Sequence, residues 1–426
     1  MERHIISAKR DLNAWLSYYE QLHPVGIDLG LSRVGKVWQK LCQTYRIRRL
    51  ARDKTISVAG TNGKGSGAQM LSMLLSAQGY GVGTYTSPHI HHFNERIKIN
   101  GRSVKDRLII EAFEAIEAAR EGTTLSYFEA TTLAGLLVFA WQQVDFAVLE
   151  VGLGGRLDAT NVVDADAALI TSVGLDHEAY LGRDIEQIAI EKAGICRPNK
   201  PAVYAQTGMY PALKAYVKKH RIPLIANGLD YQVVGERVTF ARNQFVIPEE
   251  ICDLGRHQIS NCAGVLVLLS ILERLPSDYQ SILSRFSLPG RLQKISDRPD
   301  IFVDVAHNAD AAKALADYVR RHKKPYQHCY AVLGMLGDKD HKALLSELTG
   351  IFDKVFLGTT QGQRGFSDRD LLGTAKQVLQ CPVEACGRLT DALKRAKQQA
   401  SSDDVIYAFG SFLVVEALTS CTLVAK

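Results

Sequence analysis

A glycine-rich loop at residues 60–66, Gly-Thr-Asn-Gly-Lys-Gly-Ser, is the sharpest chemical signal in this chain. Glycines let a backbone curl so that successive N–H groups face phosphate oxygens, and a following helix adds its positive N-terminal end. Lys64 supplies a point charge for the phosphates. The match to the standard P-loop is imperfect, because Val58 stands where the first glycine would fall and Gly65 precedes the hydroxyl residue Ser66. The apolar run before the loop and the helical pattern after it favour phosphate binding over a simple glycine turn.

Three further polar side chains, Ser87, Glu150 and His177, stand at or just after the carboxyl ends of apolar runs. Such runs predict buried strands of a parallel sheet, and the carboxyl ends of parallel strands face the ligand crevice. We therefore expect the three side chains to converge. Hydroxyl and carboxylate oxygens are usual ligands of Mg²⁺. Histidine is not, so on its own His177 is best interpreted as a loop histidine.

Two alternative interpretations of these segments are weaker. His89, His91 and His92 invite a zinc site, but no cysteine or second cluster is spaced to complete one, and a polar loop is the simpler interpretation. The Gly-x-Gly-Gly at 152–155 resembles a dinucleotide fingerprint but lacks its spacing, and Asp158 follows too soon to contact a ribose. An ordinary turn after a strand is the bland alternative at 152–155.

Apolar runs alternate with helical patterns along the chain, which predicts an α/β fold. Strands are expected at 55–58, 83–85, 146–151 and 167–173, and helices at 8–22 and 66–78. After Pro289-Gly290 the pattern restarts, with strands at 301–305, 330–333, 355–357 and 405–409 and helices near 309–321, 340–350, 367–379 and 388–400. We predict a P-loop NTPase-like parallel-sheet N-terminal domain over residues 1–290 and a smaller Rossmann-like α/β C-terminal domain over residues 291–426.

The composition is that of a folded protein with two or three domains, with 46% hydrophobic and 23% charged residues over 426 positions. A net charge of +6 is mild, and no run of Lys or Arg predicts nucleic-acid binding. The eight cysteines include no Cys-x-x-Cys pair, which indicates reduced thiols. No signal peptide and no bilayer-spanning run is present, so we expect a cytoplasmic protein that does not bind membranes.

Six motifs occur together in a fixed order. They are the loop 60–65, Ser87-Pro88-His89 with Phe93-Asn94-Glu95-Arg96, the segment 150–161, Asp176-His177, the Glu-Lys-Ala-Gly at 191–194, and the Asp-Val-Ala-His-Asn at 304–308. Over nearly the whole chain this resembles the folylpolyglutamate synthase family, most of all its bifunctional dihydrofolate synthase members, which are related to the Mur ligases. The resemblance implies ATP-dependent ligation of L-glutamate to dihydropteroate and to reduced folates through an acyl phosphate, in folate biosynthesis.

The resemblance also implies roles for single residues. Ser87, Glu150 and His177 would bind magnesium, which the family uses as two ions. ATP would contact Thr61, Asn62, Gly63, Lys64, Asn261, Arg291 and Asp304. The catalytic residues would be Lys64, His307 and Lys192, the last being the family's carbamylated lysine. From the sequence alone Lys192 is simply a helix lysine. Its carbamate would be an anion able to help bind the second Mg²⁺.

Three segments would line the dihydropteroate pocket according to the resemblance. Their residues are Leu31, Ser32, Arg33, Val34, Ser126, Tyr127, Phe128, Glu129, Leu157, Asp158 and Ala159. Phe128 can stack on a flat heterocycle and Asp158 can accept hydrogen bonds from it, although a core position is the plain alternative for Phe128. The chain departs from many relatives at Ala309, where they have proline, and we expect a local loop change there.

Two rival functions remain open. A Mur ligase acting on a nucleotide-linked peptide would need a separate domain ahead of the loop, and only 59 residues precede Gly60. A P-loop regulatory switch would not need a second α/β domain with a polar strand end at 304–308. We expect small-molecule partners and a monomer. The sequence leaves open whether both ligase activities are present, the length of the glutamate chain and the preferred folate.

Overall fold

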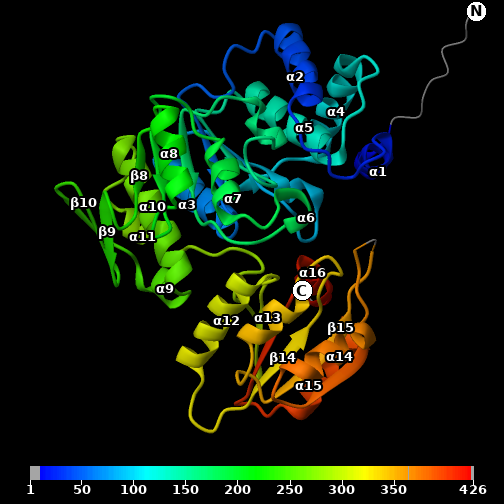
Figure 1. Ribbon diagram of the computed structural model, residues 1–426. Helices are drawn as coiled ribbons and strands as arrows, with labels where there is room; N and C mark the ends of the chain where they lie inside the picture. The colour runs from blue at the N-terminus through cyan, green and yellow to red at the C-terminus, as the bar shows by residue number, and fades with distance from the viewer. Residues whose placement is uncertain (1–9, 363, 424–426) are drawn as a thin grey trace, which may run out of the picture.

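The computed structural model of the chain describes residues 10–362 and 364–423, and two sheets organise it (Figure 1). The larger sheet has eight strands in the order β4-β3-β2-β5-β1-β6-β7-β8. The six strands from β2 to β8 in that order run parallel, and β3 and β4 are antiparallel at one edge. The bounds are β1 Lys54–Ala59, β2 Val82–Tyr85, β3 Ile97–Ile99, β4 Arg102–Ser103, β5 Phe146–Glu150, β6 Ala167–Ile170, β7 Ala202–Tyr204 and β8 Leu224–Ala226.

Strand β5 shows how this sheet holds a core on each face. Its side chains alternate, so Ala147 and Leu149 pack with the N-terminal helices while Phe146 and Val148 pack on the opposite face. The first face is covered by α1 Leu12–Leu22, α2 Ser32–Tyr45, α4 Asp106–Arg120 and α5 Tyr127–Trp141. The second is covered by α3 Lys64–Ser76, α9 Glu249–Asp253, α10 Arg256–Ile271 and α11 Tyr279–Leu283. Helices α6 Glu178–Leu181, α7 Ile185–Ala193 and α8 Pro211–Lys219 complete this half of the molecule.

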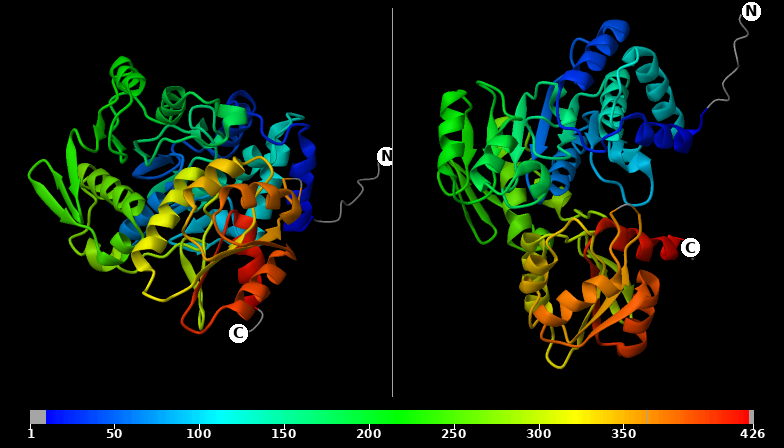
Figure 2. Two further views of the ribbon diagram at one scale, coloured as in Figure 1. Left: turned by 60° about the horizontal axis from the view of Figure 1, so that its bottom comes forward. Right: turned by 45° about the vertical axis from the view of Figure 1, so that its right-hand side comes forward.

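A small antiparallel sheet projects from the larger one. Its order is β11-β10-β9, with bounds β9 Tyr231–Val234, β10 Arg237–Phe240 and β11 Asn243–Val246. It lies at the far left in Figure 1 and in the left view of Figure 2. Two 3₁₀ turns, η1 Phe93–Arg96 and η2 Ala159–Val162, follow loops of the larger sheet.

The second large sheet has six strands in the order β12-β13-β17-β14-β15-β16, of which only β12 is antiparallel to its neighbour. The strands are β12 Gln293–Asp297, β13 Asp300–Val303, β14 Cys329–Leu333, β15 Lys354–Thr359, β16 Val383–Arg388 and β17 Val405–Phe409. Helices α12 Ala309–His322, α13 His341–Glu347 and α14 Asp368–Val378 cover one face, and α15 Leu389–Gln399 and α16 Phe412–Leu423 cover the other. This unit lies below the first one in Figure 1.

The predicted fold class is confirmed, with a parallel-dominated N-terminal sheet and a separate C-terminal α/β sheet. The expected boundary at 290/291 falls between α11 and β12. The strand expected at 167–173 ends at Ile170, because its last residues turn toward the glycine-rich loop. Short edge and antiparallel strands such as β3, β4 and β9–β11 were not predicted, since they carry little apolar periodicity. The described part of the helix expected at 8–22 is α1.

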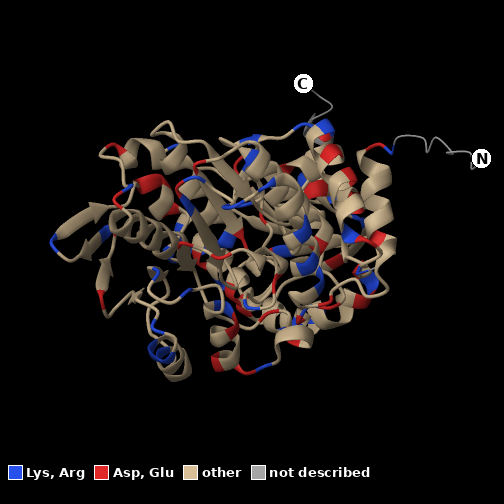
Figure 3. Ribbon diagram, turned by 90° about the horizontal axis from the view of Figure 1, so that it is seen from above, with Lys and Arg blue, Asp and Glu red and all other residues tan. Residues whose placement is uncertain are grey.

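Surface charge is mixed over this fold. In the view from above, Lys and Arg are interspersed with Asp and Glu over both halves of the molecule (Figure 3). Among the described residues, no helix is long and apolar enough to cross a bilayer. The seven cysteines whose side chains are described, all of them before α16, are free thiols.

Candidate active site

The glycine-rich loop joins β1 to α3 and is held from both sides. Its backbone takes a left-handed turn at Gly63, with φ at +86°, and α3 begins at the next residue. The Lys64 side chain folds back over the loop, and its Nζ donates to the carbonyl oxygens of Gly60 at 2.9 Å and Thr61 at 3.1 Å. The segment after β6 holds the loop, since the Asn62 N–H donates to Ser172 Oγ at 2.9 Å. The loop is therefore preorganised at the positive end of α3.

Thr61 ties the loop to the same segment. Its backbone N–H donates to the Ser172 carbonyl at 2.8 Å and its hydroxyl donates to the Gly174 carbonyl at 2.9 Å. The Gly174 N–H in turn donates to Thr61 Oγ1 at 2.9 Å. The hydroxyl is thus committed to fixing the loop.

Ser87 and Glu150 lie next to each other at the ends of β2 and β5. The Ser87 N–H donates to Glu150 Oε2 at 3.0 Å. Strand register explains why Glu150 reaches the loop, because β5 pairs with β1 so that Val58 stands opposite Glu150. Burial raises the pKa of Glu150, and the nearby Lys64 ammonium opposes that rise. Burial likewise lowers the pKa of Lys64, and the carboxylates of Glu150 and Asp176 oppose it.

His177 comes from the turn between β6 and α6, where its φ is +53°. Burial lowers its pKa to about 4 against the opposing charge of Asp176, so its imidazole is neutral near pH 7 and has a free lone pair. A hydroxyl, a buried carboxylate and a neutral imidazole together suit a divalent cation. Among the described residues, no group of three or more His, Cys, Asp or Glu side chains is placed to hold a metal ion. The set of Ser87, Glu150 and His177 contains only two residues of these types, because its third member is a serine.

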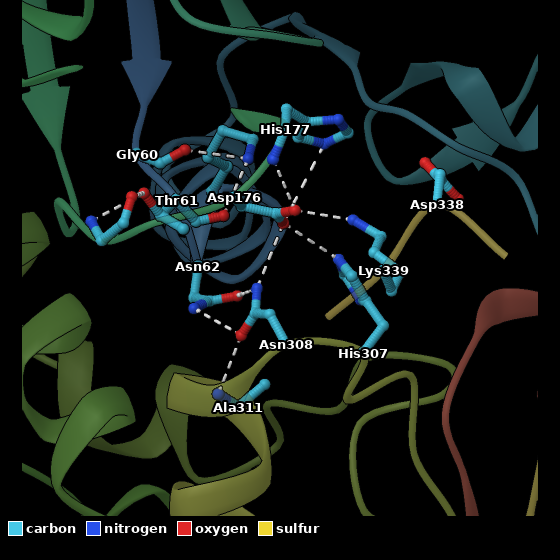
Figure 4. Close-up of polar contacts among 12 residues, drawn as sticks. Gly60, Thr61, Asn62, Asp176, His177, His307, Asn308, Ala311, Asp338 and Lys339 are labelled. Carbon is cyan, nitrogen blue, oxygen red and sulfur yellow. Dashed lines mark hydrogen bonds and ion pairs between the residues drawn. The ribbon is translucent and has the colours of Figure 1, made fainter. Parts of the chain in front are cut away.

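Asp176 is the meeting point of the two halves of the molecule (Figure 4). Its Oδ1 lies 2.6 Å from Lys339 Nζ, and its Oδ2 lies 3.3 Å from His307 Nε2. Asn308 Nδ2 donates to the same Oδ2 at 3.1 Å. Burial alone would raise the pKa of Asp176, but the hydrogen bond from His307 and the positive charges of His307 and Lys339 bring it well below its usual value. An ionised carboxylate is therefore enclosed by residues of both halves.

Asn62 and Asn308 form a reciprocal amide pair between the halves. Asn308 Nδ2 donates to Asn62 Oδ1 at 3.1 Å, and Asn62 Nδ2 donates to Asn308 Oδ1 at 3.3 Å (Figure 4). Asn308 also caps α12 by accepting the Ala311 N–H at 3.0 Å. At Ala309, where a local loop change was expected, the structure has the first residue of α12.

Sequence reasoning missed Lys339 entirely and gave Asp176 no role of its own. The only signal for Lys339 was a charged run, Asp338-Lys339-Asp340, shortly after the apolar strand at 330–333. That placement at a strand end is the same signal that selected Glu150.

A cavity of about 840 Å³ opens beside this junction. It brings together residues of the loop, of α10 and of the second sheet, and among the predicted site residues its walls include Asn62, Gly63, Asn261, Arg291, Asp304 and His307. Asn261 is buried on α10 and lies so close to Gly63 that a Cβ there would stand 2.3 Å from its Nδ2. Five of the seven predicted nucleotide contacts, all but Thr61 and Lys64, therefore share one space with His307, and its size suits a small ligand.

Asp304 and Arg291 carry opposite charges in that cavity. Asp304 accepts the N–H groups of Leu292 at 2.8 Å and Ala306 at 2.7 Å. Burial raises the pKa of Asp304 and lowers the pKa of Arg291, and each charge opposes the shift of the other. His307 is fixed by its Nδ1, 2.8 Å from the Val305 carbonyl.

Lys192 is an unusual helix lysine, because only 3% of its surface is exposed. Burial, together with a smaller effect of the Lys64 charge, lowers its pKa to about 7. A large fraction of the protein molecules therefore carries Lys192 as a neutral amine at pH 7, and the neutral amine is the form that acts as a nucleophile.

The three predicted acceptor segments lie together. Arg33 Nη2 lies 3.1 Å from Glu129 Oε1, and the Gly30 N–H donates to the Leu157 carbonyl at 3.2 Å. Ser126 caps α5 and pairs with Glu129 in a capping box. Leu31 directly precedes α2, whose first residue Ser32 is exposed, and Tyr127 begins α5.

Several residues of these three predicted segments contact other protein atoms. Val34 and Ala159 are buried in the core under α1, α2, α4 and α5. The Phe128 ring lies against Gly152, where a Cβ would stand 2.4 Å from it. Both carboxylate oxygens of Asp158 already accept hydrogen bonds, Oδ2 from the Leu153 N–H at 2.9 Å and Oδ1 from Thr160.

Comparison with known proteins accounts for this arrangement. Residues 58–269 match the Mur ligase middle domain, and residues 290–412 match the Mur ligase glutamate ligase domain. The dihydrofolate synthase/folylpolyglutamate synthase of Escherichia coli K12 is 36% identical, covering 96% of this chain and 94% of that protein. The chain belongs to the dihydrofolate synthase/folylpolyglutamate synthase family. As a member of this family it is an ATP-dependent ligase.

Solved structures of the family superpose over nearly the whole chain. E. coli FolC in complex with DHPP and ADP has a TM-score of 0.89 at 33% identity and covers 98% of both chains. A bifunctional folylpolyglutamate synthase/dihydrofolate synthase with Mn, AMPPNP and L-glutamate bound has a TM-score of 0.87 at 34% identity, covering 97% of this chain and 98% of that one. The family resemblance is thus confirmed, and a regulatory P-loop switch is disfavoured because the similarity includes both sheets.

A comparison of Gly63→Ala with Gly79→Ala should separate the effect of displacing the phosphate loop from the effect of backbone strain. Gly63 and Gly79 lie at opposite ends of α3 with φ of +86° and +85°, but only Gly63 has a neighbour in the way, Asn261. Gly79→Ala should lose about 1 kcal/mol of unfolding free energy from backbone strain, and Gly63→Ala should lose more, because its Cβ also meets Asn261. Only Gly63→Ala should also lower kcat, by about 10²-fold, because the loop must shift. Equal losses of activity in the two variants would contradict this.

Proposed function

We propose that this chain ligates L-glutamate to dihydropteroate and to reduced folates, acting as both dihydrofolate synthase and folylpolyglutamate synthase in folate biosynthesis. The observation that carries the proposal is the meeting of the phosphate loop and the polar end of the second sheet around one cavity. The Ser87 and Glu150 pair lies beside the same loop, next to Gly65. Relatives with these names cover the chain almost completely, and solved relatives hold DHPP, nucleotide and L-glutamate.

The chemistry requires activation of a carboxylate. The acceptor carboxylate attacks the γ-phosphorus of ATP, ADP leaves, and an acyl phosphate forms. The amine of glutamate then attacks the acyl carbon, phosphate leaves, and an amide results. The contribution of the protein is mainly positioning and neutralisation of charge. Lys64 places a positive charge over the loop, and enclosure between the two halves would keep water from the acyl phosphate.

We assign the predicted nucleotide contacts Thr61, Asn62, Gly63, Lys64, Asn261, Arg291 and Asp304 to ATP. The shared cavity and the preorganised loop support this assignment. Ser87, Glu150 and His177 would hold Mg²⁺, since a buried carboxylate and a neutral imidazole there suit a cation. When bound, the ion would withdraw charge from the phosphate oxygens.

Lys192 is proposed as a carbamylated residue. Its neutral amine can attack CO₂ and lose a proton, which turns a buried cation into an anion. His307 is proposed as a catalytic residue that acts from the second sheet, where it is paired with Asp176.

The predicted acceptor residues on α2, α5 and the 157–159 segment are proposed to bind the pterin end of the acceptor. Their contact across three segments supports this. Arg33 Nε is buried without a protein partner, and an acceptor atom of the substrate would satisfy it. We further propose small-molecule partners only, a monomer and a cytoplasmic location, which the free cysteines within the described residues favour.

One assay tests the proposal. The protein is supplied with ATP, Mg²⁺ and L-glutamate, and release of phosphate is measured with dihydropteroate, with tetrahydrofolate, or with neither. We expect phosphate and a glutamylated product with each acceptor, and little phosphate when acceptor or glutamate is left out. Equal phosphate release without the acceptor would contradict a ligase and favour a simple ATPase.

A further inference from the structure

Lys339 is a buried cation to which the proposed chemistry gives no role. Only 7% of its side chain is exposed, and the described residues that line the cavity do not include it. In the part of the chain that the structure describes, its ammonium has one polar partner, Asp176 Oδ1 at 2.6 Å, which belongs to the other half of the molecule (Figure 4). A buried ammonium is unfavourable unless it is paired, so Lys339 depends on the presence of Asp176 across the junction.

The loop that carries Lys339 follows β14 and is held within the second half of the molecule. On one side of Lys339, Asp338 Oδ2 lies 2.6 Å from the Arg364 guanidinium. On the other side, Asp340 caps α13 by accepting the Ala343 N–H at 2.9 Å. The lysine is therefore presented from a fixed loop, and the position of its ammonium follows the position of the second half as a body.

Asp176 connects this ammonium to His177, the next residue in the chain. Its Oδ1, the atom that Lys339 contacts, also accepts the His177 N–H at 2.8 Å. The His177 backbone is in the left-handed region, with φ at +53°. That conformation is unfavourable for a residue with a Cβ and persists where neighbouring groups hold it. One carboxylate oxygen therefore joins the second half of the molecule to the backbone of a proposed metal ligand.

We propose that Lys339 is a positioning residue of the metal site, and that it holds Asp176 so that His177 is aimed at the divalent cation when the two halves are together. The proposal rests on the proposed function, since it takes His177 to be a ligand of Mg²⁺. Such coupling is reciprocal. Closure raises the affinity of the site for the cation, and the bound cation stabilises closure by the same factor. Lys339 acts through Asp176 and does not touch the reacting atoms.

Mn²⁺ in place of Mg²⁺ allows the histidine contact to be observed directly, without turnover. In a complex of the protein with Mn²⁺ and AMPPNP, pulsed electron paramagnetic resonance should detect coupling between the ion and an imidazole nitrogen. His177→Ala should abolish the coupling, which assigns it to this residue. Lys339→Met should reduce its amplitude severalfold. Lys342→Met, which alters an exposed lysine on α13, is the matched control and should keep the wild-type amplitude.

A kinetic measurement gives the size of the effect. The Mg²⁺ concentration for half-maximal ligation should rise about 10- to 100-fold in Lys339→Met, the usual effect of removing a group that supports a metal ligand. KM for dihydropteroate should stay within about twofold, because the ion pair of Lys339 lies outside the proposed acceptor segments. Lys339→Arg, which keeps the positive charge, should recover part of the loss. Lys342→Met should again behave as the wild type.

Asp176→Asn supplies a second variant if Lys339→Met does not fold, since it removes the charge with little change of shape. It should raise the Mg²⁺ concentration for half-maximal ligation at least as much, because Asp176 also accepts from Asn308. The double variant of Asp176→Asn with Lys339→Met should be no worse than Asp176→Asn alone, since both substitutions act through one ion pair. Effects that multiply in the double variant would show that the two residues act independently, and would overturn the proposal.

The outcomes separate this proposal from the proposed function. If the wild type glutamylates dihydropteroate but Lys339→Met keeps the imidazole coupling and the wild-type Mg²⁺ dependence, the positioning role is wrong and the proposed function stands. A wild-type complex without imidazole coupling would show that His177 is not a ligand, which also contradicts the positioning role. If the wild type forms no amide with dihydropteroate or tetrahydrofolate, while the coupling is present and weakened in Lys339→Met, the proposed acceptors are wrong and the positioning role stands.

Discussion

Lys64→Ala is expected to lower kcat for ligation by about 10²- to 10³-fold, the usual effect of removing one preorganised charge or donor from a transition state. The wild-type ammonium is held over the loop by the carbonyls of Gly60 and Thr61 and lies buried near Glu150. Its loss leaves the phosphate oxygens and the buried Glu150 carboxylate with less compensating charge. Release of phosphate in the presence of acceptor and glutamate measures the effect.

Lys54→Ala is the matched control for this substitution. Lys54 begins β1, the strand that leads to the loop, and its ammonium pairs with Asp53 at 3.2 Å with 30% of the side chain exposed. A partly exposed pair contributes little, so activity should stay within about twofold. Near-normal turnover by a folded Lys64→Ala protein would refute the role of the loop in binding phosphate.

Lys192→Met is expected to lower ligation by about 100-fold, because it removes the proposed carbamate while keeping an unbranched side chain in a buried position. The carbamate itself can be observed. Protein equilibrated with ¹³C-labelled bicarbonate should show a carbamate carbon resonance that Lys192→Met lacks. Lys200→Met, which alters a half-exposed lysine paired with Asp166 at 3.0 Å, should keep both the resonance and the activity.

The same lysine predicts a direction for the pH dependence. Burial lowers the pKa of Lys192 to about 7, and CO₂ reacts with the neutral amine. At a constant concentration of dissolved CO₂, the fraction of Lys192 that is carbamylated should therefore rise as the pH increases from about 6 to 8. The rate of ligation should rise with it. A resonance that is absent, or that falls over this interval, would contradict carbamylation of this residue.

Local chemistry explains why much of the site could be predicted from the sequence. The loop 60–66 can be recognised in the sequence because phosphate binding needs glycines next to a helix start. Glu150 can be recognised because it is a carboxylate at a strand end, where a metal ion can be bound. The alternation of strands and helices predicted two α/β units for similar reasons. His177 and Lys192 needed the family resemblance, since neither differs in sequence from an ordinary loop histidine or helix lysine.

Contacts between segments that are distant in the chain could not be predicted from the sequence. Lys339 meets Asp176 across 163 positions of chain, and Asn62 meets Asn308 across 246. Nothing local marks these partners, because the free energy that selects them comes from burial and charge after folding. The same holds for His23, whose contact with Thr124 spans 101 positions.

The sequence by itself determined the reaction class and the residue types that carry it, because those depend on short motifs with their own chemistry. Only the tertiary structure decided how the motifs are placed together. It aligned β1 with β5 so that Glu150 faces the loop, enclosed Asp176 between the two sheets, and buried Lys192 until its pKa fell to about 7. Proximity and burial are properties of packing, and packing sets the pKa values on which this chemistry depends.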